Sequence, residues 1–485
     1  MNIAIIGGGV GGLMGALYLT KQGHDVTIYE KDSQLGGRLR FVEKDGYRID
    51  EGPTIVLLPE MFQELLGEAG ISKERYELLL CDPLYTIRFP DGKVYTKYPD
   101  IQRQAEEVER EFPGEKEGFL RFMAEGRERF EIGKSAFLEH SFVKKSDFWT
   151  PGNVKNLLKL KPQQSVKKLM SNYFRDERLQ LAYTLQALYI GGNPFNAPAM
   201  YSLVPFSEHE HGVHYLKGGY GSLIPLLEQE LRSRPNLKIH TGVPVDHIAI
   251  EQDKVKGIET KEGFKGFDAV IYNGDFPSIR EVLPQTKKKE FTPSSGCVLL
   301  YFGLDRVYQQ ANVHQFFIGK SYTDHMKQVF SDKKLPDDPA FYTFHPSIID
   351  DSLAPEGKGV MYVLIPVPAG TDIQWADEKE WIDGVIDRME ELAFPGFKEA
   401  VEWMEVRTPT DAEAFGLFQG GSFGIGPTLF QSGVFRPQVK PFKTGGLYAV
   451  GASVHPGGGI PIVMQGAKLL AEQVQRDLTS EGSDS

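Results

Sequence analysis

The chain has few cysteines and no long apolar run. Only two of its 485 residues are cysteines, Cys81 and Cys297, and they form neither a C-x-x-C pair nor a metal-ligand spacing. We therefore expect no disulfide framework and no metal site, and a reducing cytoplasm is the simplest setting. No stretch of about eighteen apolar residues occurs, which argues against a membrane-spanning helix. The start of the chain lacks the basic region of a removable signal, so we expect none.

Positive charge is also scarce relative to negative charge. The chain carries 54 Lys and Arg against 66 Asp and Glu, a formal net charge of −12. A nucleic-acid partner would require a basic face, so we expect no nucleic-acid partner. The length and the 41% hydrophobic content predict a sizeable packed core, distributed over two or three domains.

What the sequence does contain is a dinucleotide-binding pattern at its start. Residues 2–6 form a short apolar, β-branched run, and glycines at G-x-G-x-x-G spacing follow at once: Gly7, Gly9 and Gly12. The first glycine permits a tight turn and the second lets the backbone approach a pyrophosphate. The third lets a helix pack closely on the strand.

A helix, a second strand and an acid complete this pattern. The expected helix covers residues 13–22, and its N-terminus would offer free N–H groups to the phosphates. The second strand, residues 25–29, ends on Glu30, which is positioned to accept hydrogen bonds from a ribose diol. Strand, glycines, helix, strand and acid stand in the order of a dinucleotide fold.

A second glycine pair indicates which dinucleotide is bound. Glu30-Lys31 is followed by Gly36, Gly37 and Arg38, an element that an NAD domain does not need. The element resembles one found in flavoproteins of the amine oxidase and carotenoid desaturase superfamily. There, the glycines and the arginine close over the pyrophosphate and ribityl chain, so the resemblance implies FAD. The alternative is a surface turn with a solvated arginine.

The nucleotide pattern is split along the chain. We predict an α/β fold in which an FAD-binding, Rossmann-like domain of the glutathione reductase and amine oxidase type carries an inserted α+β substrate domain. The predicted cofactor domain is discontinuous and comprises residues 1–75, 205–290 and 436–478; the substrate and membrane-contacting domain comprises 76–204 and 291–435; a disordered tail covers 479–485. Within these segments we expect helices over 102–112, 118–130 and 378–392, a hairpin over 243–250 and 254–260, and strands over 296–302, 340–344 and 360–366.

Nearly the whole chain resembles the bacterial phytoene desaturase family, and within it the C30 branch of dehydrosqualene (diapophytoene) desaturases. The matching stretches are residues 50–56, 188–194, 212–219, 426–438 and, above all, the glycine-rich run 451–461. Within that last run Val454 stands where threonine is usual in the family, and Gly458 where alanine is common. Both are small changes in a loop that acts through its backbone.

The resemblance implies a chargeless polyene substrate that is recognised by an apolar tunnel, with hydride transfer to flavin N5. The products would be diaponeurosporene or diapolycopene. No catalytic side chain is assigned; Glu51 and His455 are weak candidates, and each is more simply a structural residue. The implied cofactor-binding residues are Gly7, Gly9, Gly12, Glu30, Lys31, Gly36, Gly37, Arg38, Gly52, Pro53, Thr54, Val245, Gly451, Gly459, Val463 and Met464.

One basic segment suggests how the enzyme reaches a substrate that is dissolved in a membrane. Residues 142–174 contain seven lysines against the single acid Asp147, interleaved with aromatic and aliphatic residues. This composition favours docking on an anionic membrane, hence a cytoplasmic enzyme peripherally associated with the inner face of the cell membrane. The alternative is a solvated helix face whose apolar side packs on the rest of the domain.

Several functional alternatives stay open at the level of sequence. Within the family they are a C40 phytoene desaturase and an oxidase of carotenoid terminal methyl groups. Beyond it they are an amine oxidase or protoporphyrinogen oxidase relative, and a non-catalytic prenyl-binding escort protein on the same fold. The number of desaturation steps, the terminal electron acceptor and the choice between a monomer and a homo-oligomer are also open.

Overall fold

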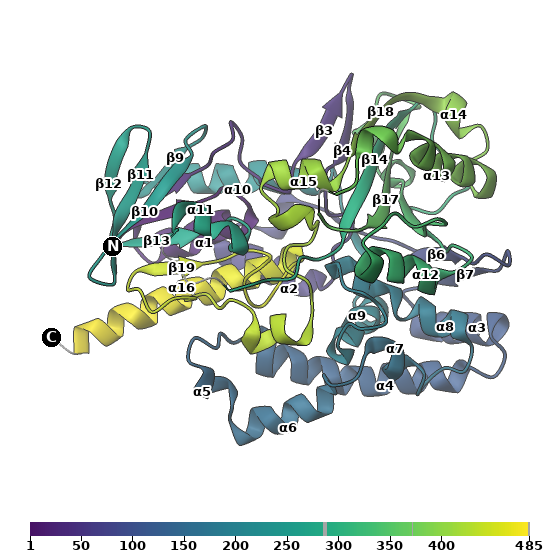
Figure 1. Ribbon diagram of the computed structural model, residues 1–485, viewed down its shortest axis with the longest axis horizontal. Helices are drawn as coiled ribbons and strands as arrows, with labels where there is room; N and C mark the ends of the chain where they lie inside the picture. The colour runs from purple at the N-terminus through teal and green to yellow at the C-terminus, as the bar shows by residue number, and fades with distance from the viewer. Residues whose placement is uncertain (285–288, 371, 484–485) are drawn as a thin grey trace.

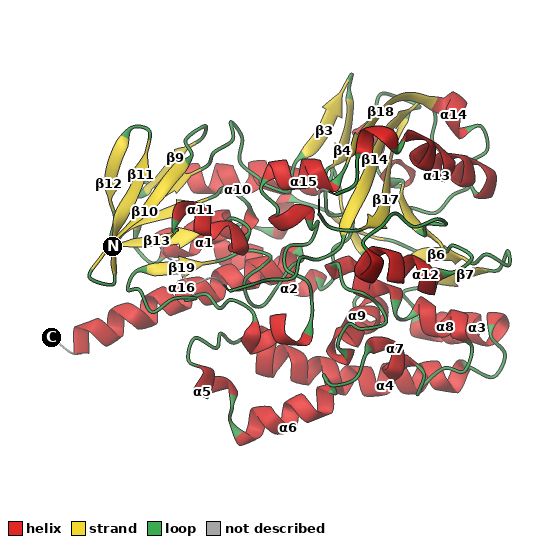
Figure 2. Cartoon of the chain, viewed as in Figure 1, coloured by secondary structure: helices red, strands yellow, loops and turns green. Residues whose placement is uncertain are grey.

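A computed structural model of the chain describes residues 1–284, 289–370 and 372–483. Figure 1 shows a parallel sheet with its helices on one side of the molecule, a mixed sheet on the other, and a group of helices along the lower edge. Figure 2 shows strands at the upper left and the upper right of the view and helices along its lower edge. This arrangement confirms the predicted α/β class, a Rossmann-like part joined to a second sheet.

The first sheet is parallel throughout and has the strand order β19-β13-β1-β2-β9. Residues 3–5 of its central strand are fully buried and are all apolar, as is usual in a parallel sheet. Helix α1 packs on this strand, and α10 and α16 lie against α1. The two helices that meet near the end of β1 are α1 and α16. The bounds are β1 (Asn2–Ile6), β2 (Asp25–Tyr29), β9 (Leu237–His240), β13 (Ala269–Tyr272), β19 (Leu447–Ala449), α1 (Val10–Lys21), α10 (Leu223–Arg232) and α16 (Ile460–Ser483).

A small antiparallel sheet, β10-β11-β12, lies in sequence between β9 and β13 of the parallel sheet. It contains the hairpin that the sequence predicts over 243–250 and 254–260. Two further strand pairs connect the two halves of the molecule. The bounds are β10 (Val245–Glu251), β11 (Lys254–Thr260), β12 (Gly263–Gly266), β3 (Phe41–Lys44), β4 (Tyr47–Asp50), β5 (Leu78–Leu80) and β8 (His214–Leu216).

The largest sheet has seven strands in the order β18-β14-β17-β16-β15-β6-β7, antiparallel except where β15 meets β6. One of its faces packs on α13, which gives a separate apolar core. The three strands and the helix predicted between 296 and 392 are all present. The bounds are β6 (Tyr85–Arg88), β7 (Val94–Lys97), β14 (Gly296–Leu304), β15 (His314–Phe317), β16 (Phe341–Phe344), β17 (Gly359–Val367), β18 (Val401–Arg407) and α13 (Lys379–Leu392).

The helices along the lower edge of Figure 1 come from residues 101–210. Side-chain oxygens cap several of them: Asp100 accepts from the Arg103 N–H at 2.7 Å, and Thr150 accepts from the Asn153 N–H at 3.1 Å. The bounds are α3 (Ile101–Glu111), α4 (Lys116–Gly133), α5 (Lys145–Phe148), α6 (Pro151–Leu160), α7 (Val166–Met170), α8 (Glu177–Ala182) and α9 (Leu203–Glu210). The remaining helices are α2 (Pro59–Ala69), α11 (Ile279–Val282), α12 (Tyr322–Lys327), α14 (Phe397–Ala400) and α15 (Pro409–Phe415).

The C-terminal end differs from the sequence prediction of a disordered segment over 479–485. Helix α16 continues to Ser483, and residues 484–485 lie outside the described residues. The hydroxyls of Thr479 and Ser480 both donate to the Arg476 carbonyl, at 2.9 Å each. These polar side chains therefore bond to the helix backbone, and the helix continues past them.

A buried carboxylate fixes the turn that leads the chain back into the parallel sheet. Asp50, at the end of β4, accepts from the backbone N–H groups of Tyr220 at 2.9 Å and Gly221 at 2.8 Å. Burial raises the pKa of Asp50 to about 7, because desolvation outweighs the two hydrogen bonds. The contact joins residues that are 170 positions apart.

We expect Asp50→Asn to lower the free energy of unfolding by about 1–3 kcal/mol, because an amide nitrogen cannot accept the second backbone N–H. Urea unfolding measures this loss. Asp351→Asn is the matched control, since Asp351 is exposed and should change stability by less than about 0.5 kcal/mol.

The difference in unfolding free energy between wild type and Asp50→Asn is expected to depend on pH. Between the ordinary pKa of 3.8 and about 7, the folded chain holds a proton on Asp50 that the unfolded chain has released. The stabilisation from Asp50 is therefore fully present below pH 3.8 and is lost as the pH rises through about 7. A wild-type advantage over Asp50→Asn that grew across this interval would contradict the assignment.

Candidate functional site

The first glycine turn lies between β1 and α1 and leaves backbone donors unused. Gly7 has a φ of +104°, and a Cβ on Gly12 would lie 2.4 Å from the Gly7 carbonyl oxygen, so both positions require glycine. A Cβ on Gly9 would contact only the Asn273 amide, at 3.4 Å. Gly9 is also the N-cap of α1 and supplies no side-chain cap, so the N–H groups of the first turn are free to bind an anion.

Glu30 lies at the carboxyl end of β2 and is buried against this turn. Its Oε2 accepts from the Gly8 N–H at 2.7 Å, and its Oε1 accepts from the Asp32 N–H at 2.9 Å. Each oxygen keeps a second lone pair, so Glu30 both fixes the turn and can accept a hydroxyl. Lys31 is exposed and donates to the Phe415 carbonyl at 2.9 Å, which places it at the rim of the site.

The second glycine pair packs directly against the first turn. The Gly36 N–H donates to the Gly8 carbonyl at 2.8 Å, and a Cβ on Gly37 would lie 3.3 Å from the Gly9 Cα. The two glycine segments therefore meet through backbone alone, as the sequence pattern requires.

Arg38 is a cation that has no acid partner within the described part of the chain. Its guanidinium donates to the Ser422 carbonyl, and it forms no ion pair among the described residues. Burial lowers the pKa of Arg38, and Asp275 opposes this effect. Because a guanidinium has five donors, several remain for an anionic or hydroxyl-rich ligand.

The segment after β4 contributes Thr54 and a glutamate that is already paired. The Glu51 carboxylate lies 2.7 Å from Arg407, and the Glu51 carbonyl accepts from the Tyr301 hydroxyl at 2.6 Å. The Tyr342 hydroxyl donates to Thr54 Oγ1 at 3.0 Å. Gly52 and Pro53 lie between these two anchored positions. An ion-paired Glu51 suits a structural role better than that of a catalytic base.

The C-terminal glycine loop reaches the same turn from the opposite side. Gly451 has a φ of +122° and Gly459 a φ of +100°, and α16 starts directly after Gly459. A Cβ on Gly11 would lie 3.1 Å from the Val463 side chain, so α16 packs tightly on the start of α1. Met464, one residue further along α16, is fully buried.

His455, in this loop, is held as a neutral brace. Its Nε2 lies 2.9 Å from the His140 carbonyl and 3.1 Å from the Phe137 carbonyl, which identifies Nε2 as the protonated nitrogen. Burial lowers the pKa of His455 to about 4. The ring therefore ties the loop to residues 137–140 and remains uncharged at neutral pH.

Two residues of this site, Asn273 and Asp275, are not predicted from the sequence. Asn273 donates to the Gly7 carbonyl at 2.9 Å, and Asp275 accepts from the Phe418 N–H at 2.9 Å and from the Ser453 hydroxyl. Both follow β13 in an Asn-Gly-Asp turn, which the sequence shows only as the end of a strand. Side-chain oxygens and amides after a buried parallel strand are the available clue.

Val245 begins β10, close to the end of β2. Two residues earlier, the Val243 N–H donates to the Glu30 carbonyl at 2.9 Å. The chain here runs past the acid at the end of β2, as an adenine contact through backbone would require. These segments together fit a dinucleotide: they offer uncapped N–H groups, a guanidinium with no ion pair among the described residues, and a carboxylate with spare lone pairs.

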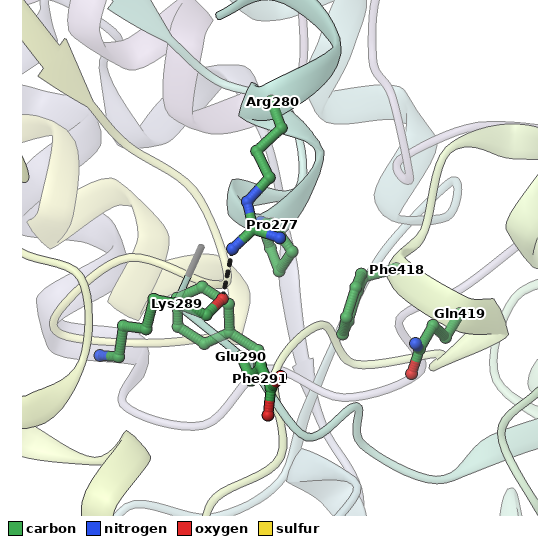
Figure 3. Close-up of a pocket in the computed structure, with 7 residues that line it drawn as sticks. All are labelled: Pro277, Arg280, Lys289, Glu290, Phe291, Phe418 and Gln419. Carbon is green, nitrogen blue, oxygen red and sulfur yellow. Dashed lines mark hydrogen bonds between the residues drawn. The ribbon is translucent and has the colours of Figure 1, made fainter. Parts of the chain in front are cut away.

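No group of three or more His, Cys, Asp or Glu that could hold a metal ion occurs among the described residues. Figure 3 shows a cavity of about 360 Å³ bounded by α11 on one side and residues 418–419 on the other. None of the predicted cofactor-binding residues lines it, so we do not assign it to the cofactor.

The chain matches known proteins over almost its full length. The sequence model of the family described as flavin containing amine oxidoreductase matches residues 10–475. A 4,4'-diapolycopen-4-al dehydrogenase of Metabacillus indicus is 53% identical over 98% of this chain and 97% of its own length. A 4,4'-diapophytoene desaturase (4,4'-diaponeurosporene-forming) of Staphylococcus haemolyticus is 34% identical over 99% of both chains.

A solved structure supports the same fold. Cyclohexylamine oxidase from Brevibacterium oxydans superposes with a TM-score of 0.64 at 14% identity, covering 98% of this chain and 99% of its own. At this level of identity the likeness concerns the fold alone. The family match and the long, highly similar relatives go further: the chain belongs to the flavin-containing amine oxidoreductases, on their carotenoid desaturase branch, and is an oxidoreductase that uses FAD.

Proposed function

We propose that this enzyme introduces conjugated double bonds into a C30 carotenoid precursor, converting dehydrosqualene (diapophytoene) to diaponeurosporene or diapolycopene. The observation that carries the proposal is 34% identity, over 99% of both chains, to a 4,4'-diapophytoene desaturase. FAD, when bound, supplies the hydride acceptor for such a reaction. The protein has to hold the cofactor, orient an apolar chain and exclude water.

The chain's own residues suit these tasks. The N–H groups at the start of α1 and the Arg38 guanidinium would hold the pyrophosphate and ribityl portion, and Glu30 would accept the ribose hydroxyls. Glu51 and His455 would serve as braces, because the first is ion-paired to Arg407 and the second is neutral and engaged with carbonyls. No side chain is needed as a base for hydride removal itself.

The proposed domain division has a simple support. All five strands of the parallel sheet come from residues 1–75, 205–290 and 436–478, and all seven strands of the mixed sheet from 76–204 and 291–435. We propose the first set as the cofactor domain and the second as the substrate domain.

A second candidate reaction is favoured by one observation. The relative with 53% identity is a 4,4'-diapolycopen-4-al dehydrogenase, a name that describes oxidation of a terminal aldehyde on the same C30 skeleton. Both reactions would use the same cofactor site and the same kind of apolar substrate. They differ in whether the product gains oxygen.

The two reactions can be separated with the FAD-loaded enzyme and liposome-borne C30 polyenes. With the oxygen-free precursor, desaturation is expected to shift the absorbance to longer wavelength and to remove hydrogen without adding oxygen. With a terminal aldehyde, oxidation would add one oxygen to the mass of the product. If neither polyene changed under mass spectrometry, the proposed function would be wrong; a C40-only activity would point to phytoene desaturation.

A mutation in the glycine turn tests how the cofactor is held. Gly9→Val is expected to fold, since its Cβ makes only a 3.4 Å contact, and to purify without flavin absorbance or activity. Gly12→Val is the contrasting variant. Its Cβ would lie 2.4 Å from a backbone oxygen, so it should reduce the yield of folded protein. Full flavin absorbance in Gly9→Val would show that the cofactor does not approach this turn.

We also propose that residues 142–174 dock the enzyme on an anionic membrane. Trp149 is 51% exposed and Leu158 66% exposed, whereas Phe148 and Leu160 of the same segment are buried. The buried side chains form a small core with Val434, and next to it Phe430 is 71% exposed. Apolar side chains from two distant segments thus border one core, beside exposed lysines. Among the described residues no helix is long and apolar enough to cross a membrane.

Charge removal tests this docking. Four substitutions by Gln should reduce sedimentation with anionic liposomes and slow turnover of liposome-borne substrate, because each lysine near the surface contributes up to about 1 kcal/mol. Flavin content should not change, and wild-type binding should fall as salt rises. The four positions are Lys155, Lys159, Lys167 and Lys168.

A control variant removes the same charge elsewhere. It replaces four lysines that are far from residues 142–174 in sequence by Gln. Three of them lie on strands or turns of the parallel and β10–β12 sheets, and one lies at the start of α13. If both variants and wild type showed equal sedimentation and turnover, the docking proposal would be wrong and residues 142–174 would be an ordinary solvated helix face. The control positions are Lys238, Lys254, Lys261 and Lys379.

A further inference from the structure

Four side chains from distant parts of the sequence form one line of hydrogen bonds that ends beside the proposed cofactor site. Cys81 Sγ lies 3.6 Å from His314 Nε2, and His314 Nδ1 lies 2.7 Å from the Tyr342 hydroxyl oxygen. The Tyr342 hydroxyl donates to Thr54 Oγ1 at 3.0 Å. We refer to these four residues as the Cys81–Thr54 network.

Only the last member of this network is accessible. Cys81, His314 and Tyr342 are buried, whereas Thr54 is partly exposed. The His314 ring also stacks on the Phe344 ring, with 5.0 Å between centroids and 11° between planes, which restrains its orientation. Because water does not compete for the inner hydrogen bonds, the positions of their protons are set by the side chains themselves.

The direction of each hydrogen bond follows from counting protons. A tyrosine hydroxyl has one proton, and Tyr342 donates it to Thr54, so His314 Nδ1 has to be the donor to the Tyr342 oxygen. Burial lowers the pKa of His314 to about 3, so the ring is neutral and carries a single proton, on Nδ1. His314 Nε2 is therefore an acceptor.

The thiol completes this order. Burial raises the pKa of Cys81 to about 12, so the thiol keeps its proton at neutral pH. Because His314 Nε2 carries no proton, the thiol is the donor of the first hydrogen bond. Every bond in the network therefore points the same way, from Cys81 to Thr54. Hydrogen bonds aligned in this way polarise one another, which strengthens the last donor.

The Thr54 hydroxyl is left with a proton to donate. Its oxygen accepts from Tyr342, and among the described residues it has no other hydrogen-bond partner. Thr54 follows Gly52 and Pro53, in the segment that we expect to hold the cofactor. FAD carries ring nitrogens and carbonyl oxygens that accept hydrogen bonds, whereas the oxygen-free polyene of the proposed reaction carries no acceptor. The Thr54 proton is therefore suited to FAD rather than to the polyene.

The position of Thr54 favours the flavin ring over the rest of FAD. The glycine turn and the charged residues around it would hold the pyrophosphate, ribityl and ribose portions, which leaves the ring for this segment. The ring also has to meet the substrate, and Thr54 bonds to a strand of the mixed sheet. In register with Tyr342 lie Leu364 and Phe316, apolar side chains that are partly exposed and would suit a polyene.

We propose that the Cys81–Thr54 network makes Thr54 a hydrogen-bond donor to the flavin ring of bound FAD, with His314 and Tyr342 as positioning residues. A donor at the ring stabilises the negative charge that the ring gains on reduction, so it favours hydride transfer to the cofactor. The buried thiol of Cys81 fixes the tautomer of His314 without contacting the ligand. The inference rests on the proposed function, since it presupposes FAD beside residues 51–54.

The first test reads the tautomer of His314 by nitrogen-15 NMR of the FAD-loaded enzyme labelled at histidine. In wild type we expect His314 to carry its proton on Nδ1, and His314→Gln identifies the signal by its loss. Tyr342→Phe removes the acceptor of that proton, so the proton should move to Nε2 and face Cys81. A wild-type His314 protonated on Nε2 would reverse the order of the hydrogen bonds and overturn the inference.

His345 is the internal reference in the same spectra. Its Nδ1 lies 2.7 Å from the Val360 carbonyl oxygen, and its Nε2 accepts from the Tyr308 N–H at 3.1 Å, so it is also protonated on Nδ1. Because its partners are different, it should keep this tautomer both in wild type and in Tyr342→Phe.

The second test measures the reduction potential of the bound flavin by equilibration with a reference dye. The equilibrium constant for reduction should fall about fivefold in Thr54→Val, the effect of one lost hydrogen bond. It should fall about threefold in Tyr342→Phe, where the Thr54 hydroxyl remains but is no longer held. Thr54→Ser keeps the hydroxyl and should retain the wild-type value. Tyr308→Phe is the matched control, because it removes a buried tyrosine hydroxyl from the apolar core on the α13 side.

An unchanged equilibrium constant in Thr54→Val, at full FAD content, would overturn the inference and leave the proposed function intact. A fall of the same size in Tyr308→Phe would also overturn it, since the change would then follow from the loss of any buried hydroxyl. Failure of the proposed reaction would appear separately, in the polyene assay, which neither the NMR spectra nor the dye equilibration uses.

Discussion

The whole site depends on how closely backbone segments approach one another around Asn273. Its side chain holds the Gly7 carbonyl at 2.9 Å, and a Cβ on Gly11 would lie 2.7 Å from its amide oxygen. The Gly451 segment passes the same side chain from the other direction. There is little room for further side chains around Asn273, because the segments at residues 7–12 and 451 both pass close to it. Their glycines leave the N–H groups of α1 as the chemically active surface.

The two sheets differ in which of their surfaces can contact a ligand. The parallel sheet presents the ends of its strands, where loops and a helix N-terminus leave polar backbone groups available to the cofactor that we propose to bind there. The mixed sheet presents a face instead, and side chains in register across it supply an apolar surface. Glu51 and Thr54 link the two, since each contacts a residue of the mixed sheet, Arg407 and Tyr342 respectively.

The sequence predicts best where a contact is local or made by backbone. The turn at residues 7–12, the acid at the end of β2 and three strands of the mixed sheet, β14, β16 and β17, follow from short patterns. The roles of Asn273 and Asp275 do not, because their partners lie more than 140 positions away. The same limit applies to the basic segment: Phe148 and Leu160 are buried against Val434, and nothing between residues 142 and 174 indicates that partner.

The order of strands in the parallel sheet has a consequence for the folding of the newly made chain. The edge strand β19 begins at Leu447, and it pairs with β13, which in turn pairs with β1. During synthesis the first strand therefore waits for most of the polypeptide before its sheet is complete. Contacts of such long sequence separation form slowly and leave unpaired strand edges exposed in the meantime. The junction of α1 with α16, where we propose that FAD is held, therefore forms only after the C-terminal part of the chain has been made.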